Sequence, residues 1–173
     1  GEAKVQLPIT SDYRMAQAFA KRISPNLVSE QGTSIGKALS MAMMSFAGDS
    51  DRSRAVILIT DGETHDSNAL AVAKQAAEMG VKIFTIGIGT PEGAPISING
   101  DFIRDAKGEM VVSKLNESML EEIASTTEAA YVRASKQSIG LEEIVQKINE
   151  LEKGELTTLR FEEYNEQFHY LLW

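Results

Sequence analysis

The sequence predicts an α/β domain with a doubly wound, mostly parallel sheet in three layers. Residues 55–59 are five consecutive apolar residues, and residues 81–88 form a second run rich in β-branched side chains. Apolar runs of this length are typical of parallel strands buried on both faces. An Ala-rich helical stretch lies between them and is closed by Gly80. Strand, helix and strand in this order indicate a right-handed parallel crossover.

The elements before this crossover are predicted from proline placement and apolar spacing. A short strand is expected over residues 5–9, and Pro8 confines it to a sheet edge because proline cannot donate to the ladder. A helix follows, with Met15 and Ile23 on its inward face. A second helix is expected over residues 35–46, where apolar residues recur at helical spacing.

The elements after the crossover are predicted in the same way. Residues 89–107 are rich in Gly, Pro, Asn and Asp and predict a long surface loop with room for a small hairpin. Asn116 is expected to cap a helix that runs to about residue 124. Residues 130–133 predict a third parallel strand, and a last helix follows Ser138.

Composition excludes several classes of function. The 173 residues are 43% hydrophobic, so the chain can form one domain with a sizeable core. The net charge of -8, without a basic stripe, argues against a nucleic-acid partner. No cysteine is present, so disulfides and thiolate metal sites are excluded.

Motifs for nucleotide binding and nucleophilic catalysis are incomplete. Gly32 and Gly36 are separated by three residues where a phosphate loop has four, and Ala38 follows the lysine where the loop needs Ser or Thr. Gly87 and Gly89 follow a strand, but Pro91 comes next, and no helix opens to receive a pyrophosphate. The sequence also has no Gly-x-Ser-x-Gly motif.

Two residues remain as candidates for chemistry, Thr33 and Asp61. Asp61 follows a strand directly, and ligands of open α/β sheets bind at the carboxyl ends of the strands. Thr33 precedes a helix start, so its hydroxyl could converge with that carboxylate on Mg²⁺, which prefers oxygen ligands. The alternatives for these two residues are a helix cap and an ordinary turn residue.

Three segments together resemble a von Willebrand factor A domain: residues 31–38, 55–63 and 86–89. Residues 5–13 and 89–96 are similar to the Bat (aerotolerance-type) group of bacterial membrane proteins. The resemblance implies a metal-ion-dependent adhesion site, in which an Asp-x-Ser-x-Ser loop, a Thr and an Asp hold a divalent ion. Its open coordination position takes an acidic group from a partner. By position in the motif, Thr33 and Asp61 are the Thr and the Asp.

The sequence departs from this family in one respect, since no Asp-x-Ser-x-Ser motif is present. The resemblance therefore implies that the first strand, the first helix and the second strand of the fold are missing here. Because that first strand is central, we expect an unpaired sheet edge, and either another chain supplies a strand or the strands pair differently.

The resemblance extends to domain organisation and function. It implies a partial von Willebrand A-like domain over residues 1–153 and an aromatic juxtamembrane segment over residues 154–173. The expected function is a non-enzymatic, magnesium-dependent protein interaction, with the domain anchored in a bacterial inner membrane and facing the periplasm. The partner is a protein, such as another membrane-anchored von Willebrand A protein. The alternatives are a hydrolase or phosphotransfer domain with Asp61 at its active edge, and a metal-free assembly module.

Overall fold

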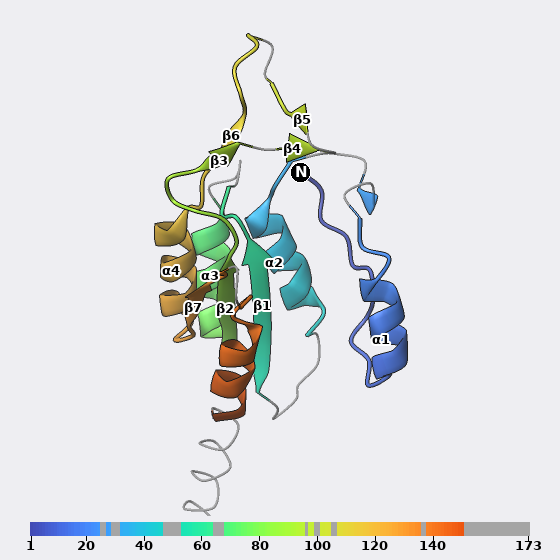
Figure 1. Ribbon diagram of the computed structural model, residues 1–173. Coiled ribbons are helices and arrows are strands. Elements are labelled where there is room, and N and C mark those ends of the chain that lie inside the picture. Colours follow the sequence, from blue (N-terminus) through green and yellow to red (C-terminus); the bar gives the residue numbers. More distant parts are fainter. Residues whose placement is uncertain are drawn as a thin grey trace, which may run out of the picture.

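The computed structural model describes residues 1–24, 27–28, 32–46, 53–63, 68–95, 97–98, 101–104, 107–135 and 138–150. Its centre is a parallel sheet of three strands in the order β1-β2-β7 (Figure 1). The strands are β1 (Arg54–Thr60), β2 (Val81–Gly87) and β7 (Tyr131–Arg133). The predicted parallel crossover and the predicted third strand are both confirmed.

Helices cover both faces of this sheet. One face carries α2 (Ile35–Met44), α3 (Ala69–Glu78) and α4 (Glu117–Thr126). Side chains from all three helices meet Ile83 of β2 in one buried cluster. The opposite face packs Phe84 and Ile86 of β2 against Ile144, which lies in the helical segment 141–150. The predicted doubly wound, three-layer architecture is therefore confirmed.

An excursion of short antiparallel strands separates β2 from α4. β3 (Ala94–Pro95) pairs with β6 (Val112–Ser113), and β4 (Ser97–Ile98) pairs with β5 (Asp101–Phe102). Figure 1 shows both pairs together beyond the end of the sheet at which α2 begins. The predicted loop therefore contains more pairing than a single small hairpin.

The N-terminal predictions are only partly confirmed. The expected strand over residues 5–9 is wrong, because these residues form no strand. Pro8 lacks the N–H that a ladder needs. The helix does form, as α1 (Tyr13–Ala20), and Asp12 Oδ1 caps it by accepting from Met15 N–H at 3.0 Å. Its inward face was wrong, since α1 stands apart from the sheet and has no buried residue (Figure 1).

The burial of β1 differs from the prediction in the same direction. We expected this strand to be buried on both faces, but Ile57 and Ile59 are 37% and 51% exposed. Both side chains lie on the face opposite Val56 and Leu58, which pack against the cluster around α2. The cause is position, because β1 is the edge strand of the described sheet.

Residues 154–173, where we predicted a juxtamembrane segment, lie outside the described residues. Within the described part of the chain, none of the helices combines the length and the apolar character needed to cross a bilayer.

Candidate metal centre at the carboxyl edge of the sheet

Asp61 lies directly after β1, at the carboxyl edge of the sheet. Its side chain is partly buried and accepts hydrogen bonds from within the chain. Oδ1 accepts from Glu63 N–H at 3.1 Å, and Oδ2 accepts from the Ser113 hydroxyl at 3.3 Å. These donors hold the carboxylate at the strand end.

The turn after Asp61 depends on Gly62. This glycine has φ of +77°, a conformation that side chains with a Cβ rarely adopt. A Cβ at this position would lie 3.0 Å from the carbonyl oxygen of Asn116. Asn116 in turn donates its backbone N–H to the Asp61 carbonyl at 3.1 Å, and its side chain caps α4. The turn is therefore fitted closely against the start of α4.

The base of the excursion is tied to the same edge by backbone hydrogen bonds. Lys114 N–H donates to Glu63 Oε1 at 2.9 Å. Leu115 N–H donates to the carbonyl of Thr90 at 3.0 Å. Ser113, the last residue of β6, thus reaches Asp61 because its neighbours are anchored on both sides of the site.

Thr33 is exposed and lies one residue before Ser34, which is the N-cap of α2. The buried side chains Ile35 and Leu39 of α2 belong to the cluster against which Val56 and Leu58 of β1 pack. Figure 1 shows the start of α2 and the end of β1 at the same end of the domain. The structure therefore places the two predicted residues at one end of the sheet.

The donor set is of the right kind for a hard cation but is small. The described oxygens at this edge are the Asp61 carboxylate and the hydroxyls of Thr60, Ser113 and Thr33. No group of three or more His, Cys, Asp or Glu side chains that could hold a metal ion occurs among the described residues. Such donors suit an ion that keeps several of its waters, as Mg²⁺ does, and they do not form a closed protein cage.

A second polar cluster lies near this edge and was not foreseen from the sequence. The Tyr131 hydroxyl donates to Glu117 Oε1 at 2.7 Å, and Arg133 Nη1 lies 3.5 Å from the same oxygen. Burial, followed by the hydrogen bond to Glu117, raises the pKa of the Tyr131 phenol. The phenol lies over Gly87, where a Cβ would come within 2.8 Å of its oxygen. No local sequence signal connects Glu117 with Tyr131, which lies 14 residues further on.

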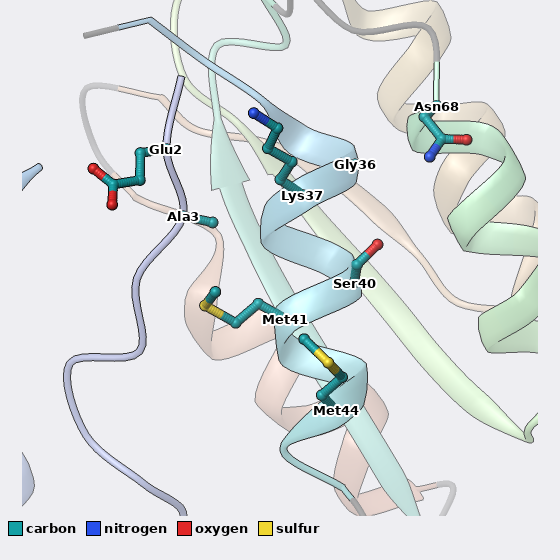
Figure 2. Close-up of a pocket in the computed structure, with 8 residues that line it drawn as sticks. All are labelled: Glu2, Ala3, Gly36, Lys37, Ser40, Met41, Met44 and Asn68. Carbon is teal, nitrogen blue, oxygen red and sulfur yellow. The ribbon is translucent and has the colours of Figure 1, made fainter. Parts of the chain in front are cut away.

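A pocket of about 440 Å³ lies elsewhere, between the N-terminal segment and α2 (Figure 2). Its lining comes from the N-terminal segment, from one side of α2 and from the residue before α3: Glu2, Ala3, Gly36, Lys37, Ser40, Met41, Met44 and Asn68. Asp61 is not part of this lining. The deepest concavity and the predicted site are therefore separate features.

Fold and site together define a doubly wound α/β domain with an oxygen-rich ligand edge. Residues 1–147 match the model of the von Willebrand factor type A domain, and the chain belongs to this family. Its members are generally protein-interaction modules rather than enzymes, and they commonly bind a divalent metal.

Two solved structures are similar to this chain over most of its length. The conserved hypothetical protein BatB from Bacteroides thetaiotaomicron is 45% identical, with a TM-score of 0.80, over 86% of this chain and 73% of that one. An aerotolerance-related membrane protein from Bacteroides fragilis, carrying multiple mutations to serine, is 44% identical, with a TM-score of 0.77, over 84% and 73%. The expected likeness to the Bat group is confirmed. A comparison with curated proteins found no match.

Proposed function

We propose that this chain is a protein-interaction module in which a divalent ion at Asp61 and Thr33 bridges to a carboxylate of a protein partner. The observation that carries the proposal is the position of Asp61. Its carboxylate stands at the carboxyl end of β1, where α/β sheets bind ligands, in a domain of the von Willebrand factor A family.

The donors at this edge explain why a partner carboxylate would bind. Asp61 supplies one negative charge, and the hydroxyls nearby are neutral, so Mg²⁺ held here keeps a net positive charge. A hard cation with open positions binds carboxylate oxygens well. An acidic side chain from a partner would replace a water molecule and complete both the charge balance and the coordination.

The setting of the intact protein is inferred from its relatives. The Bacteroides fragilis relative is named as a membrane protein. We propose that the intact protein is likewise anchored in a bacterial inner membrane, with this domain in the periplasm. The aromatic residues 161–173 would then lie next to the membrane, as such side chains do at bilayer interfaces. The partner would be another membrane-anchored protein, such as a second von Willebrand A protein.

The test is the thermal unfolding of the chain with and without Mg²⁺. An ion that binds only the folded state adds about 1.4 kcal/mol of stability at ten times its Kd. For a chain of this size that corresponds to a rise in Tm of about 3–6 °C. Asp61→Asn keeps the shape of the side chain but removes its charge, and it should abolish the rise. Asp101→Asn, at an exposed position of β5, is the matched control and should retain it.

Acetate is the simplest probe for the partner carboxylate. Added with Mg²⁺, it should raise the Tm of the wild-type chain further, and without Mg²⁺ it should have no effect. A Mg²⁺-dependent rise that persists in Asp61→Asn would contradict the proposed site, and so would the absence of any rise in the wild-type chain.

A further inference from the structure

We propose that the open edge of β1 is a dimerisation surface, at which β1 of a second copy pairs antiparallel about a two-fold axis at Ile57. Among the described residues, β1 pairs with β2 on one side and with no strand on the other. Ile88 N–H donates to the Thr60 carbonyl, so Thr60 directs its backbone toward β2. Because backbone groups alternate along a strand, Ala55, Ile57 and Ile59 direct theirs toward the open side.

This edge lacks the features that normally protect an edge strand. Such strands carry proline, an outward lysine or a bulge, or they are very short. β1 has seven residues, and its register with β2 is unbroken from Arg54 opposite Val81 to Thr60 opposite Gly87. Its sequence contains no proline and no lysine. The exposed side chains of Ile57 and Ile59 add apolar surface beside the free backbone groups.

The chemistry of the edge points to a second copy of the same strand. An added strand would lie between two helical layers and therefore needs apolar side chains on both of its faces. β1 itself meets this requirement, with Val56 and Leu58 on one face and Ile57 and Ile59 on the other. Although each copy carries a net charge of -8, the only charged residue in this strand is Arg54, so the edge itself is a weakly charged strip.

Charge complementarity selects the antiparallel orientation. Arg54 begins β1, and Asp61 follows its end. Antiparallel pairing centred on Ile57 places Arg54 opposite the partner's Thr60 and beside the partner's Asp61, and the two-fold axis repeats this contact. Parallel pairing would instead align Arg54 with the partner's Arg54, and like charges directly opposite each other are destabilising.

The register predicts one contact that can be trapped covalently. Ile57 directs its backbone outward, so Ile57 and the partner's Ile57 would form a hydrogen-bonded antiparallel pair. The Cα atoms of such a pair are about 5.5 Å apart, which lies within the range spanned by disulfides. The chain has no cysteine, so a single introduced cysteine reports on this contact alone.

The first experiment compares Ile57→Cys with Ile88→Cys under mild oxidation of the full chain at equal concentration. Ile88 is 48% exposed and follows the end of β2, so it is the control for random collision. We expect Ile57→Cys to form a covalent dimer much faster than Ile88→Cys. Equal rates for the two variants would overturn the proposal.

The second experiment measures self-association of the wild-type chain by analytical ultracentrifugation. A monomer–dimer equilibrium is expected, and Ile59→Lys should raise the Kd of the dimer about tenfold or more, because an edge lysine opposes strand pairing. Ile139→Lys, at a residue that is 61% exposed, should leave the Kd unchanged. Circular dichroism checks that both lysine variants are folded. A wild-type chain that stays monomeric, a dimer insensitive to Ile59→Lys, or open-ended polymers would each overturn the two-fold pairing.

Discussion

Substitution of Gly62 by alanine tests whether the turn after Asp61 is held by close contact with α4. Two costs apply at this position. The first is the left-handed backbone, with φ of +77°, which costs an alanine about 1–2 kcal/mol. The lower entropy of the unfolded chain offsets about 0.4–1 kcal/mol of this cost.

The second cost is the contact with Asn116. The new Cβ would lie 3.0 Å from its carbonyl oxygen, 3.1 Å from its Cβ and 3.2 Å from its backbone nitrogen. Two of these atoms belong to the backbone at the start of α4, so the neighbour can move little. Overpacking of this kind costs about 1–3 kcal/mol. We therefore expect Gly62→Ala to lower the free energy of unfolding by about 2–4 kcal/mol.

Gly80→Ala is the matched control. Gly80 has φ of +67°, but no atom lies within 4 Å of the position a Cβ would take. Only the backbone cost applies there, so the expected loss is about 1 kcal/mol or less after the entropy offset. Urea unfolding of both variants, followed by circular dichroism, gives the two free energies. Equal losses would refute the argument that Asn116 holds the turn.

Two further predictions concern hydrogen bonds outside the site. The buried Thr127 Oγ1 accepts from Ile83 N–H at 2.9 Å, so Thr127→Val should cost about 1–3 kcal/mol in urea unfolding and Thr127→Ser clearly less; equal losses would contradict this role of the hydroxyl. Burial and the bond to Glu117 raise the pKa of Tyr131 in the folded state, so the stability it contributes is complete below the unfolded pKa of about 10 and is lost at higher pH. Urea unfolding between about pH 9 and pH 11 should therefore show a smaller loss of stability in Tyr131→Phe than in the wild-type chain, and an identical loss would refute it.

The sequence was sufficient for the elements whose signals are local. The crossover from β1 through α3 to β2 follows from two apolar runs and a helix-ending glycine, and β7 follows from a short β-branched run. The surroundings of these elements could not be predicted in this way. Whether Ile57 is buried depends on what lies beyond β1, and a local pattern cannot show that the strand is at an edge.

The role of Thr127 illustrates the same limit. β7 pairs only with residues 85–87 of β2, so it stops short of Ile83. The Thr127 hydroxyl satisfies the backbone N–H of Ile83 where a longer strand would have done so. A single threonine after a helix gives no signal of this substitution, because it depends on the length of a strand that follows later in the chain.

The candidate site divides along the same line. Asp61 was predictable because a carboxylate directly after a buried run lies at the ligand edge whatever the rest of the fold does. Ser113 was not, since it lies 52 residues away and reaches Asp61 only through the two-residue pairing of β3 with β6. Strands this short have no periodicity that a sequence pattern could reveal.

The hydrogen bonds of Asp61 have a consequence for the proposed ion. Its two carboxylate oxygens already accept from Glu63 N–H and the Ser113 hydroxyl, so an ion has to compete with these donors. An ion held by one carboxylate and neutral hydroxyls also gains much of its charge neutralisation from a partner carboxylate. Ion binding and partner binding would then be strongly coupled, and by linkage each would raise the affinity of the other by the same factor. A weak ion site in the isolated chain is thus what a partner-dependent module requires.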